Sequence, residues 1–195
     1  LFRSFRANCP ALETVVVFGA QAPAGLLAYE EFIAPHPTTF DWPELDEKSG
    51  AMLCYTSGTT GNPKGVLYTH RSLMLHALAG GSRDAFNVGE GDVVYPIVPM
   101  FHVNAWSLPY VGALAGVKLV FPGAKLDGES LYELFEGEKV TISAGVPTVW
   151  LLVLQFLQQN NKKLSTLKRM TVGGSACPPA LSAQDVAQAL AGSGV

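Results

Sequence analysis

Residues 55–66 read YTSGTTGNPKGV and follow directly on an apolar run, residues 51–55, that predicts a buried strand. Within residues 56–65 there are four aliphatic hydroxyls, three glycines and one lysine. Glycines let several backbone N–H groups face one anion, hydroxyls add hydrogen-bond donors, and the lysine adds a mobile positive charge. The stretch therefore predicts a polyphosphate-binding loop at the end of a strand.

A glycine-rich loop by itself is a weak signal, because many turns between strands and helices need the same residues. The spacing also differs from the P-loop of kinases and GTPases. That loop needs a glycine directly before its lysine, and this chain has Pro63 there. A P-loop nucleotidase fold is therefore disfavoured.

The rest of the chain alternates between apolar runs of strand length and segments of helix length. Strands are predicted at residues 13–18, 51–55, 93–98, 117–121, 140–144 and 168–172. Helices are predicted at residues 71–79, 106–115, 130–136, 148–159 and 180–190. Such alternation implies right-handed crossovers, so we expect an α/β fold with a largely parallel, doubly wound sheet flanked by helices. Residues 35–50 lack periodicity and are expected to form a surface connection rather than a domain boundary.

Composition limits the partners of this chain of 195 residues, of which 48% are hydrophobic and 15% charged. Acidic residues outnumber basic ones by 16 to 13, which argues against nucleic acid as a partner. The apolar runs are shorter than the roughly 20 residues that a transmembrane helix needs. Cys9, Cys54 and Cys177 are too widely spaced for a metal knuckle or a disulfide framework, so we expect a cytoplasmic location. Because both ends stop abruptly, we expect residues 1–195 to be an internal fragment of a larger protein.

Residues 56–65 resemble the signature of the adenylate-forming superfamily, which contains acyl-CoA synthetases, adenylation domains of peptide synthetases and firefly-type luciferases. The flanking residues 40–47, FDWPELDE, and 68–72, YTHRS, are similar to those of medium- and long-chain fatty acyl-CoA ligases. The resemblance covers almost the whole chain. It implies part of the N-terminal, AMP-binding domain of an adenylate-forming enzyme.

Two further motifs look like those of the same family. Residues 99–106, PMFHVNAW, follow a predicted strand, and in α/β folds ligands bind beyond the carboxyl ends of strands. Without the resemblance, His102 and Trp106 would be read as ordinary core or helix-start residues. With it, this segment borders the acyl site, and Trp106 acts as a gate to a fatty-acid tunnel. Residues 172–179, VGGSACPP, resemble the loop that lies against the adenylate, although the same glycines also suit a simple turn.

The reaction implied by the resemblance has two halves. A carboxylate attacks the α-phosphate of ATP to give acyl-AMP and pyrophosphate, and coenzyme A then displaces AMP. The expected substrates are a fatty acid, ATP and coenzyme A, with Mg²⁺ accompanying ATP, and a homodimer is compatible with the family. Lys64 and His102 are the catalytic candidates, and Thr56 is also a candidate Mg²⁺ ligand. The ATP and phosphate candidates are Thr56, Ser57, Gly58, Thr59, Thr60, Gly61 and Lys64, and the acyl and adenylate candidates are His102, Val103, Trp106, Gly173, Gly174 and Ser175.

Several elements of the family pattern have no counterpart in residues 1–195. They are the aromatic-Gly-x-Thr-Glu motif, the ribose-binding aspartate, the hinge, and the C-terminal domain with its catalytic lysine. We therefore expect this chain alone to be inactive in the full reaction. Two alternatives remain open. One is another adenylate-forming enzyme: an aryl or short-chain acyl-CoA ligase, a luciferase-like oxidase or a carrier-protein-loading domain. The other is a non-catalytic nucleotide-binding module.

Overall fold

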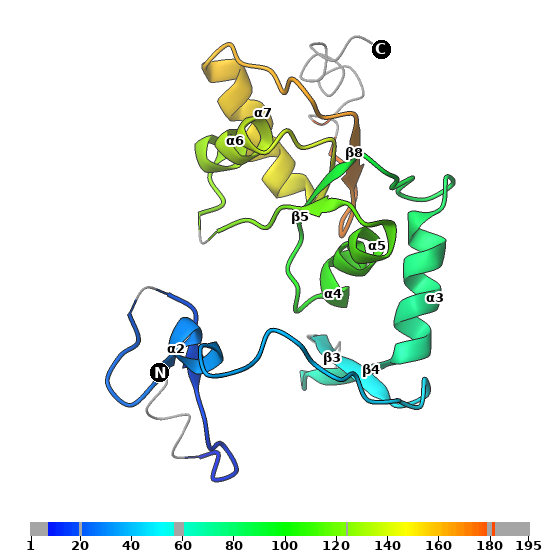
Figure 1. Cartoon of the computed structure of the whole chain (residues 1–195). Helices are drawn as coiled ribbons and strands as arrows, with labels where there is room; N and C mark the ends of the chain where they lie inside the picture. Colours follow the sequence, from blue (N-terminus) through cyan, green and yellow to red (C-terminus); the bar gives the residue numbers. More distant parts are fainter. Residues whose placement is uncertain (1–7, 20, 57–60, 124, 179–180, 182–195) are drawn as a thin grey trace. The chain divides into compact units, whose positions relative to one another are not determined.

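The computed structural model describes residues 8–19, 21–56, 61–123, 125–178 and 181 (Figure 1). The chain divides into two compact units between Glu44 and Leu45. This division lies inside residues 35–50, which the sequence predicted to be a surface connection without a boundary. Every residue of this segment is exposed, as expected of a connection.

The N-terminal unit is small. Strand β1 (Val16–Val17) pairs in parallel with β2 (Leu27–Ala28), and helix α2 (Tyr29–Ile33) follows directly. The rings of Phe18 and Tyr29 stack with their centroids 4.4 Å apart. The strand predicted at residues 13–18 is thus present in part, but it belongs to a two-stranded sheet of its own.

The second unit contains the main sheet, whose four strands run parallel in the order β6-β5-β7-β8. These strands are β5 (Val93–Ile97), β6 (Lys118–Leu119), β7 (Ile142–Gly145) and β8 (Arg169–Val172). Each matches a strand predicted from the sequence. The α/β class and the largely parallel sheet are therefore confirmed.

Helices cover both faces of this sheet, because alternate residues of the central strands point to opposite sides (Figure 1). On one face Tyr95 and Ile97 pack with Phe135 of α6 (Gly128–Gly137) and Trp150 of α7 (Pro147–Gln159). On the other face the buried cluster is Val94, Leu108, Ile142 and Ala144, to which α5 (Leu108–Ala115) contributes. These strands are buried on both faces, as parallel strands usually are.

Local signals explain where the helices begin. Thr69 caps α3 (His70–Gly81) in a reciprocal capping box with Ser72, and the Asp127 side chain accepts a hydrogen bond from the Ser130 N–H at the start of α6. Proline occupies the first turn of α7. The helix predicted at residues 180–190 lies, apart from Leu181, outside the described residues. No helix among the described residues is long and apolar enough to cross a membrane.

The strand before the phosphate loop was wrongly predicted as a buried member of the parallel sheet. In the structure β3 (Gly50–Thr56) forms an antiparallel hairpin with β4 (Lys64–Thr69), a strand that the sequence analysis missed. Leu53 and Tyr55 are exposed, and Cys54 between them is buried. The physical reason is the short connection, since a parallel partner would need a crossover of a dozen or more residues.

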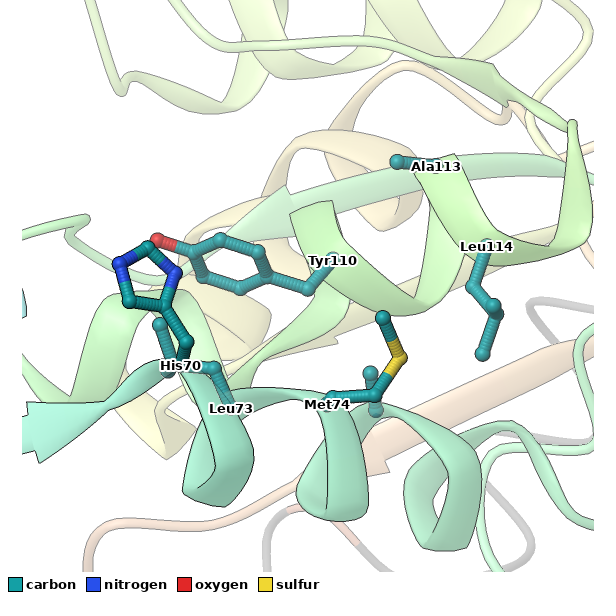
Figure 2. Close-up of a pocket in the computed structure, with 7 residues that line it drawn as sticks. His70, Leu73, Met74, Tyr110, Ala113 and Leu114 are labelled. Carbon is teal, nitrogen blue, oxygen red and sulfur yellow. The ribbon is translucent and has the colours of Figure 1, made fainter. Parts of the chain in front are cut away.

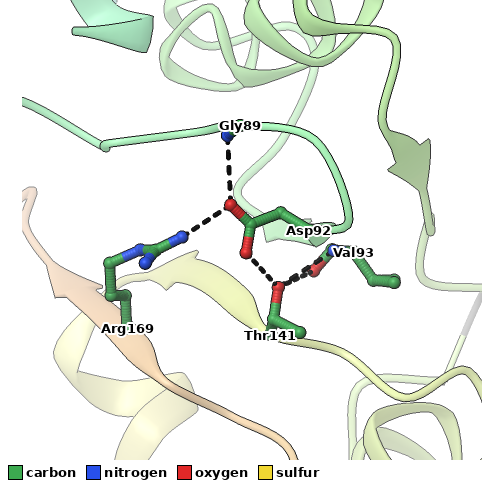
Figure 3. A network of polar contacts seen from close by, with 5 residues as sticks. All are labelled: Gly89, Asp92, Val93, Thr141 and Arg169. Atoms are coloured by element: carbon green, nitrogen blue, oxygen red, sulfur yellow. Dashed lines mark hydrogen bonds and ion pairs between the residues drawn. The ribbon is translucent and has the colours of Figure 1, made fainter. Parts of the chain in front are cut away.

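A polar network joins the amino ends of three parallel strands (Figure 3). The Asp92 carboxylate accepts hydrogen bonds from Arg169 Nη2 at 2.6 Å, from Thr141 Oγ1 at 2.8 Å and from the Gly89 N–H at 3.1 Å. The Thr141 hydroxyl oxygen in turn accepts a bond from the Val93 N–H at 2.9 Å. The Asp92 side chain is only 11% exposed, so its charge needs these partners.

We expect Asp92→Ala to lower the free energy of unfolding by about 2 kcal/mol, because it leaves Arg169 and Thr141 without their shared acceptor. Thermal denaturation of a protein carrying this chain measures the loss. The matched control is Glu47→Ala, which removes an exposed ion pair with Arg71 and should change the melting temperature little. Equal effects of the two substitutions would contradict the role given to Asp92.

Candidate active site at the carboxyl edge of the sheet

The carboxyl ends of β5, β7 and β8 meet at one edge of the sheet. Ile97 pairs in register with Gly145, and Gly145 pairs with Val172. The chain therefore leaves the three strands side by side, at residues 98–106, 146–147 and 173–175. Two of the motifs singled out in the sequence follow β5 and β8, which flank β7, at the edge of the sheet where α/β folds bind their ligands.

Trp106 lies against the glycine pair that follows β8. A Cβ atom placed on Gly173 would approach the Trp106 ring atom Cη2 to 2.7 Å, which is closer than real Cβ contacts allow. A Cβ on Gly174 would lie 3.1 Å from Val146 Cγ1 and 4.0 Å from Trp106 Cζ2. Gly174 also has a φ of +84°, which favours glycine. The structure thus brings two of the candidate motifs into contact through Trp106 and Gly173, which are 67 positions apart in the sequence.

The segment that carries Trp106 is a left-handed turn. Consecutive φ values from Val103 to Ser107 are +48°, +51°, +51°, +55° and +63°. Left-handed backbone costs roughly 1–2 kcal/mol for each ordinary L-residue, and such a run is rare. The sequence predicted a helix from residue 106, but the right-handed helix α5 begins only at Leu108, after α4 (Val103–Trp106) has turned in the opposite sense.

Burial stabilises this left-handed turn. Asn104, Ala105 and Ser107 are each no more than 1% exposed. The Ser107 carbonyl accepts hydrogen bonds from the N–H groups of Tyr110 and Val111 at 3.0 and 2.9 Å, so the turn also starts α5. Trp106 also packs against the buried cluster that contains Val94 and Leu108. The direction of its indole is therefore fixed by the turn on one side and the glycines on the other.

The hairpin β3–β4 carries the described part of the predicted phosphate loop. Thr56 and Lys64 pair across the hairpin, and both are exposed. Gly61 has a φ of +91° and open space where a Cβ would lie. Lys64 forms no ion pair with any described residue, so its ammonium group is available to an anion. Ser57, Gly58, Thr59 and Thr60 lie outside the described residues.

His102 and Ser175 are both exposed, and Val103 is half-buried. The His102 N–H donates to the Pro99 carbonyl at 3.0 Å, and its own carbonyl accepts from the Ala105 N–H at 3.1 Å. These two hydrogen bonds fix the backbone of His102, from which its side chain extends. No hydrogen bond or ion pair between described residues joins His102 to Lys64, so the two catalytic candidates sit on separate elements.

Sequence reasoning missed a contact between the hairpin and the left-handed turn. The Cys54 thiol donates a hydrogen bond to Asn104 Oδ1 at a separation of 3.1 Å. Cys54 is 5% exposed and Asn104 is 1% exposed. Burial, and to a smaller degree the nearby Cys54, raises the pKa of Tyr110 on α5. The signal that could have suggested Asn104 is its residue type, since asparagine tolerates left-handed backbone best after glycine.

An apolar pocket of about 260 Å³ lies between α3 and α5 (Figure 2). The His70 ring and the Tyr110 hydroxyl lie together at one end of it. The pocket is on a different side of α5 from Leu108, Val111 and Gly112, which are the buried residues of that helix. Its remaining lining consists of Leu73, Met74, Ala77, Ala113 and Leu114.

Comparison with known protein families supplies the remaining observation. The model of the family described as AMP-binding enzyme matches residues 4–191. This chain belongs to the AMP-binding enzyme family.

Relatives of this AMP-binding chain include named acyl-CoA ligases. It is 48% identical over 184 residues to the long-chain-fatty-acid–CoA ligase of Thermus thermophilus, an alignment that covers 94% of this chain and 34% of the relative. It is 51% identical over 162 residues to the medium-chain-fatty-acid–CoA ligase of Ectopseudomonas oleovorans, covering 83% of this chain and 30% of the relative. The AMP-binding chain therefore spans about a third of the length of these curated relatives.

Solved structures agree with this membership. The anthranilate CoA ligase AuaEII, determined with anthranoyl-AMP, superimposes with a TM-score of 0.83 at 28% identity, covering 98% of this chain and 37% of that one. A red-emitting luciferase from Phrixothrix hirtus superimposes with a TM-score of 0.78 at 22% identity, covering 97% of this chain and 37% of that one, a likeness of fold. The fold predicted from the resemblance, part of the AMP-binding domain of an adenylate-forming enzyme, is confirmed.

The packing of Trp106 on Gly173 gives a prediction about this AMP-binding site. Gly173→Ala puts a methyl group into the space of the indole, and we expect it to destabilise the protein by about 1–3 kcal/mol or to displace the ring. In the Trp106→Ala background the same methyl meets no indole and should cost much less. Thermal melting of the four proteins of this cycle measures the coupling. An equal cost of Gly173→Ala in both backgrounds would show that the indole does not press on this glycine.

Proposed function

We propose that this chain is the ATP-phosphate-binding and acid-binding part of an acyl-CoA ligase that activates a fatty acid. The observation that carries the proposal is the exposed Lys64, which pairs with Thr56 across β3–β4, forms no ion pair with any described residue, and adjoins the glycine- and hydroxyl-rich sequence of residues 56–65. The names of the relatives, which are CoA ligases of fatty acids, support the ligase class. Experiments below use the full-length protein, meaning one of the relatives' length that carries this chain.

In the proposed reaction the carboxylate of the acid attacks the α-phosphorus of ATP. The bond from this phosphorus to the bridging oxygen breaks, and pyrophosphate leaves with that oxygen. The thiolate of coenzyme A then attacks the acyl carbonyl, and AMP leaves. The acid is already ionised, so the first half needs charge neutralisation and in-line positioning rather than a general base. Lys64 is proposed to meet the charge that develops on pyrophosphate, with the hydroxyls of Thr56, Ser57, Thr59 and Thr60 as further donors.

Mg²⁺ belongs to this proposal as the partner of ATP. No group of three His, Cys, Asp or Glu side chains in the described part of the chain could hold a metal ion alone. This fits an ion that takes most of its ligands from phosphate oxygens, as Mg²⁺ commonly does, with the exposed Thr56 hydroxyl as a protein ligand. Bound there, the ion would neutralise phosphate charge.

We propose that the acid lies at the carboxyl edge of the sheet, with its reacting end beside His102 and the backbone of Gly174 and Ser175. Val103 and the indole of Trp106 would border its apolar tail. The close packing of Trp106 on Gly173 supports a gate, because the absence of a side chain there gives the indole its present position. The three cysteines are free, in keeping with the proposed cytoplasmic location.

We expect Lys64→Ala to lower the rate of adenylation by on the order of 100-fold or more, because the charge that the lysine meets develops in the transition state. ATP–pyrophosphate exchange by the full-length protein measures this rate. Lys163→Ala, which removes an exposed lysine after α7, is the matched control and should leave exchange unchanged. An unaltered exchange rate in Lys64→Ala would remove the role assigned to Lys64.

We expect Trp106→Ala to change the dependence on acid chain length more than the KM for ATP. Each buried CH₂ contributes about 0.8 kcal/mol, so the wild type should prefer medium or long aliphatic acids, and loss of the indole should flatten or shift that preference. The measurement is kcat/KM for acids from acetate to palmitate. A preference for acetate or benzoate, or an unmoved profile in the variant, would contradict the gate while leaving adenylation untouched.

The same assay separates the alternative functions. A carrier-protein-loading domain would form acyl-AMP but transfer the acyl group to a carrier rather than to coenzyme A. A non-catalytic module would bind ATP without releasing pyrophosphate. Pyrophosphate release that depends on an aliphatic acid, followed by an acyl-CoA product, is the outcome that the proposal requires.

A further inference from the structure

The hairpin and the left-handed turn belong to separate parts of the hydrogen-bonded framework. Strands β3 and β4 form a sheet of their own, and the turn of residues 103–107 follows β5 of the four-stranded sheet. Among the hydrogen bonds between described residues, Cys54 to Asn104 joins β3–β4 to this turn, across 50 positions of sequence. Its two residues stand close to both motifs. Cys54 is two positions before Thr56, and Asn104 is two positions from both His102 and Trp106.

The turn also needs contacts with residues outside it to keep its left-handed conformation. Five successive residues other than glycine hold positive φ, and each ordinary one costs roughly 1–2 kcal/mol against right-handed backbone. Such a conformation persists only where the surroundings over-determine it. Asn104 suits this position for two reasons. Its backbone tolerates a φ of +51°, and its amide oxygen accepts a hydrogen bond from Cys54, outside the turn.

We propose that Cys54 and Asn104 are positioning residues that set the acid-binding turn against the phosphate-binding hairpin. This inference rests on the proposed function and adds to it a specific pair. Through Asn104 the thiol holds the turn that directs Trp106 and His102, and through β3 it holds the strand that ends at Thr56. Neither residue touches a reacting atom.

The contact between Cys54 and Asn104 is buried on both sides. The Cys54 thiol donates to Asn104 Oδ1 of the turn. Burial first, and the nearby Cys54 second, raise the pKa of Tyr110 on α5, so the phenol stays neutral. The His70 ring lies beside the Tyr110 hydroxyl (Figure 2). Without this donor the buried amide oxygen of Asn104 would lose its hydrogen bond, and we expect the turn to shift so that the oxygen finds another partner.

The test compares Cys54→Ala, Cys54→Ser, Asn104→Gly and the double variant Cys54→Ala/Asn104→Gly in the full-length protein. Cys54→Ala should raise the KM for the acid by about 3- to 10-fold and alter the chain-length profile, with the KM for ATP changed less than about 2-fold. Cys54→Ser keeps a donor and should restore most of the wild-type behaviour. Asn104→Gly accepts the left-handed backbone and removes only the amide, so it should reproduce the Cys54→Ala profile. Cys9→Ala removes a thiol of the N-terminal unit and is the matched control.

Non-additivity decides whether the two residues act together. The double variant should resemble either single variant rather than multiply their effects on the acid KM. Multiplied effects, or a Cys54→Ala protein that melts earlier with an unmoved acid KM and chain-length profile, overturn the positioning role. If Cys54→Ala does not fold, Cys54→Ser and Asn104→Gly decide by the same readouts. A wild type without adenylation activity overturns the proposed function and this inference with it, whereas an active wild type with unmoved variants overturns this inference alone.

Discussion

The arrangement of the site depends on the in-register parallel pairing of β5, β7 and β8. Parallel strands send all their carboxyl ends to one edge, so Ile97, Gly145 and Val172 fix the starting points of three loops at once. The Asp92 network at the amino ends holds the same three strands in register from the other side (Figure 3). The polar network that stabilises the sheet and the candidate active site therefore lie at opposite edges of the same sheet.

At the carboxyl edge of the sheet, side-chain packing rather than regular secondary structure determines where the residues lie. Trp106 occupies the space that is free because Gly173 has no side chain. The turn that carries Trp106 adopts an unfavourable hand and is held by burial and by the Cys54 thiol. The position of the indole therefore depends on the missing side chain of Gly173 as well as on the turn.

The sequence predicted the main sheet because buried parallel strands appear as uninterrupted apolar runs, as at residues 93–98 and 140–144. The same rule failed for residues 51–55, where an apolar run forms an exposed hairpin strand, because the run does not reveal its partner. The left-handed turn escaped prediction because its hand is imposed by tertiary packing. The contact between Cys54 and Asn104 joins residues 50 positions apart. Asparagine is a residue type that tolerates left-handed backbone, but nothing local indicates that these two side chains meet. The roles of the site residues were inferred from resemblance, and for residues 57–60 the sequence still provides the whole argument.

The short link from β7 to α7 has an electrostatic consequence. Only Val146 separates the end of β7 from Pro147, the first residue of the 13-residue helix α7. The amino end of α7 therefore lies at the carboxyl edge of the sheet. Peptide dipoles aligned along a helix amount to about half a positive charge at this end. A carboxylate or phosphate that reaches the edge therefore enters a region where the backbone alone contributes positive potential. Attraction of anions is in this way built into the order of strand and helix, in a chain whose side chains carry a net charge of −3.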